Sequence, residues 1–167
     1  STPYYRIFMD EFVMPDRLNF CREDFIERFW EPQNENRILD NNLTLKGICE
    51  ENLSGHFWSG RNSDTLISRI EQCFDSPKII ISIREQRSML GSLYSNYIKN
   101  GGHLGVKKLL NDVLIEGSLV QEKLSYDRLI LDAIDRFGGD SVYVYPYEQF
   151  SNNPNLVLND IYRFIGL

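Results

Sequence analysis

Short apolar runs alternate with amphipathic stretches along the chain. Residues 78–83 form a β-branched run that ends at Arg84, and residues 141–145 form a second compact run of this kind. Uninterrupted apolar runs of this length are typical of strands that are buried on both faces of a parallel sheet. A looser alternation of apolar and polar residues over 43–49 predicts a third strand.

Apolar residues at helical spacing surround these predicted strands. One helix is expected to begin at the capping residues 62–64 and to end before Pro77. Further helices are predicted over residues 22–30, 87–99, 106–114, 119–137 and 156–165. Glycines at 101–102 and 138–139 are expected to end two of these helices.

The order of these elements predicts a single α/β domain over residues 1–167. We expect three layers, in which a mainly parallel sheet is flanked by helices on both faces. Ligands of such folds bind at the carboxyl ends of the strands, so functional side chains are sought there.

Composition and charge narrow the classes of partner. The chain has 42% hydrophobic and 25% charged residues, with a net charge of -6 and a sequence pI near 5.0. This balance argues against broad binding of nucleic acid or of an anionic membrane, so any anion site must be local. No apolar stretch is long enough for a membrane span or a signal peptide, and a cytoplasmic location is expected.

Cys21, Cys49 and Cys73 are an odd number of cysteines at wide spacings. They predict reduced thiols in the core, because neither a disulfide framework nor a zinc site has this pattern. No metal site is expected.

Arg84 is the first candidate for ligand binding, because it directly follows the predicted strand 78–83. A guanidinium is a forked donor with permanent charge, and Ser88 and Ser92 lie one helical turn apart on the next predicted helix. These three side chains are able to grip one phosphate. From the residues alone, an arginine at a strand end is usually solvated or salt-bridged, and Ser88 can equally be a helix cap.

Three segments resemble the sulfotransferases that use 3'-phosphoadenosine 5'-phosphosulfate (PAPS). KIIISIREQRSMLGSLY at 78–94 is similar to the family's 3'-phosphate segment, with Glu85-Gln86 where Asn-Pro or Asp-Pro is common. VYVYPYEQF at 142–150, followed by Pro154 and IYRFIGL at 161–167, is similar to the family's C-terminal run. ICEENLSG at 48–55 resembles a strand end of bacterial members.

The resemblance implies a phosphate-loop NTPase-like sulfotransferase fold and the transfer of a sulfuryl group from PAPS to a hydroxyl or amine acceptor. It implies that Arg84 and Ser92, with Ser88 nearby, bind the cofactor. The acceptor is expected to be a small molecule or carbohydrate, with no nucleic acid partner and with a possible homo-oligomer.

The chain departs from the family at the site for the 5'-phosphosulfate. Family members begin with a strand and a loop that pairs Lys with Ser or Thr, and nothing before residue 44 has this pattern. The expectation is therefore a domain that lacks its N-terminal strand and phosphosulfate loop, and that by itself neither binds PAPS tightly nor transfers sulfate.

Glu51 is the candidate general base, because it follows the predicted strand 43–49 at a position where family members carry a catalytic His or Glu. A carboxylate within hydrogen-bond reach of the acceptor hydroxyl is able to remove its proton. Glu51 is also readable as an exposed loop carboxylate, and Glu50 is adjacent. Two alternative functions stay open at this point: a relative of the phosphate-loop kinases, and a non-catalytic binding module.

Overall fold

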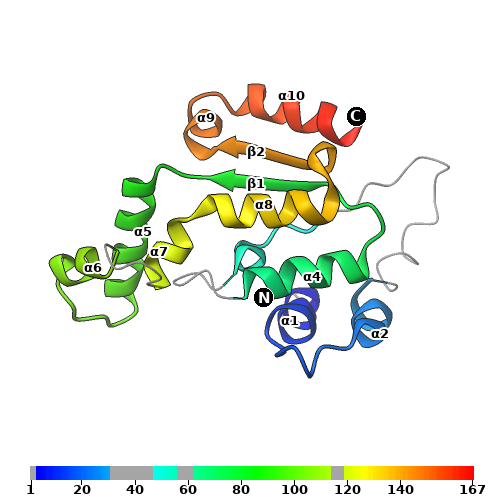
Figure 1. Ribbon diagram of the computed structural model, residues 1–167, viewed down its shortest axis with the longest axis horizontal. Helices are drawn as coiled ribbons and strands as arrows, with labels where there is room; N and C mark the ends of the chain where they lie inside the picture. Colours follow the sequence, from blue (N-terminus) through cyan, green and yellow to red (C-terminus); the bar gives the residue numbers. More distant parts are fainter. Residues whose placement is uncertain (1–2, 31–46, 56–61, 114–118) are drawn as a thin grey trace.

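Helices dominate the chain. The computed structural model describes residues 3–30, 47–55, 62–113 and 119–167. Figure 1 shows α9 and α10 on one side of two strands and α8 on the other, with α4 and the N-terminal helices beyond α8. The helical elements of the N-terminal half are α1 (Pro3–Phe8), η1 (Met9–Val13), α2 (Arg22–Phe25), η2 (Ile26–Trp30), η3 (Glu51–Ser54) and α4 (Ser63–Cys73). Those of the C-terminal half are α5 (Gln86–Lys99), α6 (Val106–Val113), α7 (Leu119–Leu124), α8 (Tyr126–Phe137), η4 (Gly139–Ser141), α9 (Tyr147–Asn152) and α10 (Pro154–Ile165).

Two parallel strands form the sheet of the described residues. β1 (Ile79–Ile83) pairs with β2 (Val142–Pro146), in a register that sets Ile79 opposite Val142 and Ile83 opposite Pro146. Both strands were predicted from the sequence, and the fold is broadly α/β, as expected. The residues described between 47 and 50 form neither helix nor strand, and the first part of the third predicted strand, at 43–46, lies outside the described residues.

The expectation that β1 is buried on both faces is wrong. Its residues alternate between half-buried and exposed, and Ile80 in its middle keeps 41% of its surface exposed. The paired residue Tyr143 on β2 is covered by α10, where the Phe164 ring lies 5.5 Å from the Tyr143 ring. Helix α10 therefore shields β2 and leaves the same face of β1 open.

Several helices differ from the sequence prediction, and α1 and η1 form where none was predicted. The single helix expected over 119–137 is divided into α7 and α8 at Ser125, whose backbone ψ of 73° is not helical. The Ser125 hydroxyl donates to the Gln121 carbonyl at 2.9 Å, which is a local side-chain bond of the kind that competes with helix continuation. In addition, α9 begins directly after β2 where no helix was predicted.

Phenylalanine rings form the core of the N-terminal part. Phe12 and Phe25 are fully buried and their ring centroids lie 4.7 Å apart, with Phe8 and Phe29 packed beside them. Helix α4 closes this core through the buried Leu66. Because α1, η1, α2 and η2 bury aromatic side chains against one another, these short helices are held by packing more than by their own length.

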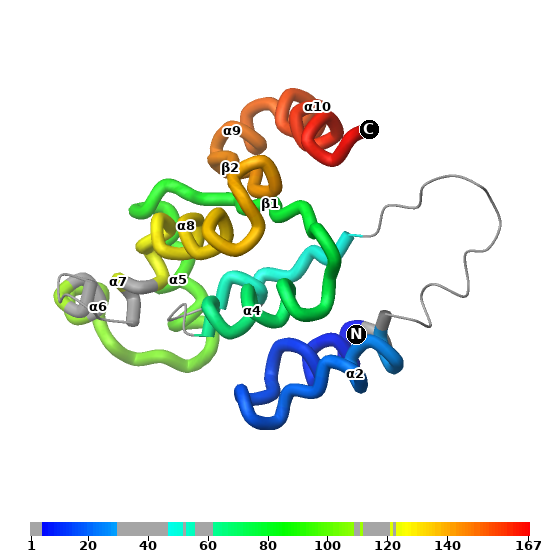
Figure 2. Tube along the Cα trace, turned by 45° about the vertical axis from the view of Figure 1, so that its right-hand side comes forward, coloured from blue at the N-terminus to red at the C-terminus, as the bar shows by residue number. Residues whose placement is uncertain are grey.

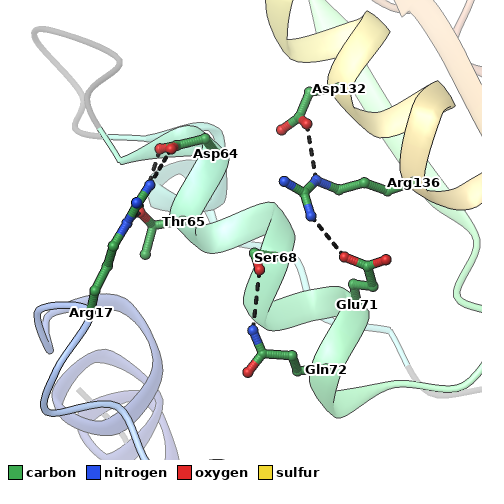
Figure 3. A network of polar contacts seen from close by, with 8 residues as sticks. All are labelled: Arg17, Asp64, Thr65, Ser68, Glu71, Gln72, Asp132 and Arg136. Atoms are coloured by element: carbon green, nitrogen blue, oxygen red, sulfur yellow. Dashed lines mark hydrogen bonds and ion pairs between the residues drawn. The ribbon is translucent and has the colours of Figure 1, made fainter.

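Helix α4 is tied on both sides by arginines, as Figure 3 shows. Arg17 bonds Asp64 and donates to the Thr65 hydroxyl, and Arg136 of α8 contacts Glu71 at 2.7 Å and Asp132 at 2.9 Å. These pairs are at least partly exposed and contribute little to stability individually. They set α4 between the N-terminal helices and the layer of α8.

The expectation that the cysteine thiols lie in the core holds for one of the three. Cys73 is buried in the phenylalanine core, and burial raises its pKa to about 11. Cys21 and Cys49 are exposed.

Arg69 is the buried charge of this core and caps the end of η1. It is 2% exposed, and its guanidinium donates to the carbonyls of Phe12 at 2.5 Å, Pro15 at 2.5 Å and Asp16 at 3.0 Å. The guanidinium carbon also lies 4.5 Å from the centroid of the Phe20 ring. One side chain thus satisfies several carbonyls that the end of a helix leaves without a partner.

We expect Arg69→Ala to lower the free energy of unfolding by about 3 kcal/mol, because buried carbonyls lose their donor and a packed side chain is removed. Urea unfolding measures this change. Arg163→Ala serves as the control, since Arg163 is an exposed arginine paired with Asp160 and its loss costs less than about 1 kcal/mol. Equal losses in the two variants would contradict this role of Arg69.

Candidate functional site

The register of the two strands brings Arg84 and Tyr147 together. Ile83 is paired with Pro146, so the next residue of each strand emerges at the same edge of the sheet. The guanidinium carbon of Arg84 lies 5.3 Å from the centroid of the Tyr147 ring, within the range of a cation–π contact. Arg84 therefore lies at the carboxyl end of β1, where parallel sheets collect ligands.

Two buried donors at this edge lack a hydrogen bond. Among the described side chains, Arg84 Nε and Tyr126 Oη are the buried polar atoms without a partner. Tyr126 is the first residue of α8, and its hydroxyl lies near the Arg84 backbone without the geometry of a proper hydrogen bond. A buried donor without an acceptor costs free energy, and two such donors near the end of β1 indicate a place for an acceptor from outside the chain.

The Tyr126 hydroxyl stays protonated at neutral pH. Burial raises the pKa of Tyr126, and the charges of Glu148 and Glu85 raise it further, against an opposing effect of Arg84. The phenol is consequently a donor throughout the physiological range.

Two carboxylates lie beside these donors. Glu148 Oε1 accepts a hydrogen bond from the Glu85 backbone N–H at 3.0 Å. The Glu85 side chain accepts from the Ser88 backbone N–H at 2.7 Å and so caps α5. Backbone hydrogen bonds from Ser88 and Arg87 lower the pKa of Glu85. The start of α5 is thus already occupied by a carboxylate of the protein itself, and the interpretation of Ser88 as the helix cap is wrong.

Ser88 and Ser92 are exposed on α5, one turn apart, as their spacing predicted. Within the described residues no hydrogen bond joins either hydroxyl to Arg84. A shared grip of Arg84 and Ser92 on one phosphate stays a prediction.

Glu51 begins the short helix η3 and is exposed. Its carbonyl accepts the Ser54 hydroxyl at 2.9 Å, and the same hydroxyl oxygen accepts from Lys123 Nζ at 3.1 Å. Burial lowers the pKa of Lys123, and the charge of Glu51 opposes this shift. The Glu51 turn is thereby fastened to α7 through a half-buried lysine.

A second contact connects α7 to the start of α5. Gln86 Nε2 donates to the carbonyl of Leu124 at 3.1 Å, and the Leu124 side chain is buried against Met89, Leu90 and Tyr94. Lys123 is the neighbour of Leu124 in the chain. The contacts therefore run from Glu51 through Ser54 and Lys123 to the helix that follows Arg84.

Sequence reasoning missed Tyr126 and Lys123 as members of this site. Both lie in a segment whose apolar spacing predicts one amphipathic helix, in which a tyrosine and a lysine carry no signal of their own. The break at Ser125 turns Tyr126 toward Arg84, and spacing alone does not reveal such a break.

The remaining observations limit the chemistry of the described residues. They contain no group of three His, Cys, Asp or Glu side chains placed to hold a metal ion. In the same ranges, no helix combines the length and apolar character that crossing a membrane requires.

No family model, curated protein or solved structure matches the chain.

The unpartnered hydroxyl of Tyr126 has a measurable consequence. We expect Tyr126→Phe to leave the free energy of unfolding unchanged or to raise it by up to about 1 kcal/mol, since it removes a buried donor that has no acceptor. Tyr94→Phe is the matched control, because Tyr94 Oη donates to the Leu104 carbonyl and its removal costs about 1 kcal/mol. A loss in Tyr126→Phe as large as that in Tyr94→Phe, by urea unfolding, would show that Tyr126 is already satisfied.

Proposed function

We propose that the edge formed by the carboxyl ends of β1 and β2 binds the 3'-phosphate of PAPS, in a PAPS-dependent sulfotransferase. The observation that supports this proposal is the buried Nε of Arg84, which has no acceptor within the described residues. A guanidinium matches phosphate geometry better than any other side chain, and it keeps its charge at every physiological pH.

The neighbouring side chains complete a donor set for this phosphate. Tyr126 Oη supplies an uncharged donor beside Arg84, and the Tyr147 ring supports the guanidinium from one face. Ser88 and Ser92 add hydroxyls on α5 in the proposed complex. PAPS when bound supplies the sulfuryl group of the reaction.

The local charge sets a limit on the affinity. The charge of Arg84 is outweighed by the carboxylates of Glu85 and Glu148, so a phosphate at this edge meets repulsion as well as attraction. The residues that the structure describes are therefore expected to bind the nucleotide weakly by themselves, in line with the weak binding expected from the sequence.

Glu51 is proposed as the group that removes the proton from the acceptor. In the transfer the acceptor oxygen forms a bond to sulfur, the bond from sulfur to the phosphate oxygen breaks, and the hydroxyl proton passes to the Glu51 carboxylate. The hydrogen bonds of Ser54 to the Glu51 carbonyl and of Lys123 to Ser54 hold this turn in place.

In a chain that carries the family's phosphosulfate loop upstream, we expect Arg84→Ala to weaken the binding of adenosine 3',5'-bisphosphate about 30-fold or more, because a charge-assisted contact to phosphate is lost. Isothermal titration calorimetry measures the affinity. Arg163→Ala is the control, since this arginine is exposed on α10 and should leave the affinity unchanged. If Arg84→Ala binds as tightly as the wild type, the phosphate site lies elsewhere.

For the base, in a chain that carries the family's phosphosulfate loop upstream, we expect Glu51→Gln to lower the turnover of sulfate transfer from PAPS to a carbohydrate hydroxyl about 100-fold, with the affinity for adenosine 3',5'-bisphosphate nearly intact. The substitution keeps the shape of the side chain and removes its basicity. Glu50→Gln is the control for the adjacent carboxylate and should retain most of the turnover. Equal turnover in Glu51→Gln and wild type would assign the role to another group.

A further inference from the structure

Lys123 of α7 and Ser54 of η3 form a pair of reactive side chains that the proposed transfer uses only to hold a turn. Lys123 Nζ donates to Ser54 Oγ at 3.1 Å, although the two residues are 69 positions apart in the chain. Both residues are half-buried. An amine in hydrogen-bond contact with a serine hydroxyl is the arrangement on which serine–lysine nucleophiles are built.

The turn that carries Ser54 is fixed by the residues on either side of it. Leu53 packs against the phenylalanine core, and the Leu53 backbone N–H donates to the Glu50 carbonyl at 3.2 Å. Gly55 is buried and has a φ of 91°, a backbone conformation that favours glycine directly after the serine. The position of the Ser54 hydroxyl is therefore set before any ligand binds.

Helix α7 is fixed by the residue that follows Lys123. The Leu124 side chain is buried against residues of α5, and the Leu124 carbonyl accepts from Gln86 Nε2 at 3.1 Å. Figures 1 and 2 show α7 beside α5, away from α10. The amine and the hydroxyl are thus brought together by the packing of two separately anchored elements, and not by the free movement of a surface lysine.

The amine of Lys123 is suited to accept a proton from this hydroxyl. Burial lowers the pKa of Lys123, against an opposing effect of the Glu51 charge, so the amine loses its proton at a lower pH than an exposed lysine does. The Ser54 hydroxyl donates to the Glu51 carbonyl at 2.9 Å while Lys123 donates to its oxygen. Once the amine is neutral, its lone pair is an alternative acceptor for the same hydroxyl hydrogen.

Two other hydroxyls of the chain show the contrast. Thr65 accepts from the Arg17 guanidinium at 2.9 Å, and Ser68 accepts from the Gln72 side-chain amide at 3.1 Å. A guanidinium keeps its proton at every physiological pH, and an amide nitrogen donates without being basic. Ser54 differs from both because its neighbour is a group that donates when charged and accepts a proton when neutral.

We propose that Ser54 and Lys123 act as nucleophile and general base in the hydrolysis of carboxylic esters with uncharged acyl groups. This activity does not rest on the proposed function, because neither PAPS nor the Arg84 edge takes part in it. An uncharged acyl group is favoured because Glu51 lies in the same turn as Ser54, and its carboxylate repels an anionic one.

The reaction needs water alone as a co-reactant. Lys123 Nζ takes the hydroxyl proton while Ser54 Oγ forms a bond to the carbonyl carbon of the ester. The bond from that carbon to the alcohol oxygen then breaks, and the alcohol leaves with the proton from Nζ. Water attacks the acyl-serine in the same way, which releases the carboxylic acid and returns the proton to Ser54 Oγ.

Labelling with a fluorophosphonate tests this pair, because a serine oxygen that loses its proton forms a bond to phosphorus and releases fluoride. We expect mass spectrometry to find the label on Ser54 of the wild type. Lys123→Arg keeps a charged donor to Ser54 and removes the base, so it should slow the labelling about 100-fold, whereas a merely structural lysine would tolerate the change. Lys78→Arg is the control, at a lysine that donates to the Asp140 carbonyl, and should not slow the labelling.

Hydrolysis of p-nitrophenyl acetate is the second measurement. We expect Ser54→Ala to lower the rate about 100-fold, and Ser68→Ala, at a half-buried serine of α4, to leave it unchanged. If Lys123→Arg fails to fold by circular dichroism, Lys123→Gln takes its place with the same expected loss, because an amide donates but takes up no proton. The absence of a label on Ser54, labelling of the lysine variant at the wild-type rate, or equal hydrolysis by the two serine variants overturns the proposal.

Discussion

The parallel pairing of β1 with β2 is the constraint on which the candidate site depends. Because Ile83 lies opposite Pro146, Arg84 and Tyr147 emerge at one edge, and the segments that follow them are brought together there. Helix α5 starts after Arg84 and α9 starts at Tyr147, and the backbone N–H of Glu85 is bonded to Glu148 across the pair. A shift of one residue in the register would turn these side chains to opposite faces.

The site contains buried polar atoms that a sheet edge without a ligand would be expected to keep hydrogen-bonded. Arg84 Nε and Tyr126 Oη are buried without an acceptor in the part of the chain that the structure describes, while the carboxylates of Glu85 and Glu148 already make hydrogen bonds to the backbone. The N-terminal core shows the opposite arrangement, because both terminal nitrogens of the buried Arg69 guanidinium donate to backbone carbonyls. The contrast between the satisfied guanidinium of Arg69 and the buried Nε of Arg84, which has no acceptor among the described residues, is the reason for assigning ligand binding to Arg84.

The sequence predicts the parts of the fold that local patterns determine. The apolar runs at β1 and β2 and the helical spacing of α4, α5, α6 and α10 were all found where they were predicted. Patterns did not predict the break at Ser125, where the Ser125 hydroxyl bonds the nearby Gln121 carbonyl. They also did not predict the exposure of Ile80 or the aromatic packing of α1 and η1, because both depend on contacts distant in sequence. For the same reason Arg84 was found by its place after a strand, whereas Tyr126 became visible only through its contact with that arginine.

The most direct test of this account is the NMR signal of the Arg84 Nε–H group, assigned by its loss in Arg84→Lys. We expect the signal to move downfield and its exchange with water to slow when adenosine 3',5'-bisphosphate is added, because the buried donor gains an acceptor. The Nε–H signal of Arg163, exposed on α10, should not change. An Arg84 signal that is unaffected at saturating nucleotide would contradict the account.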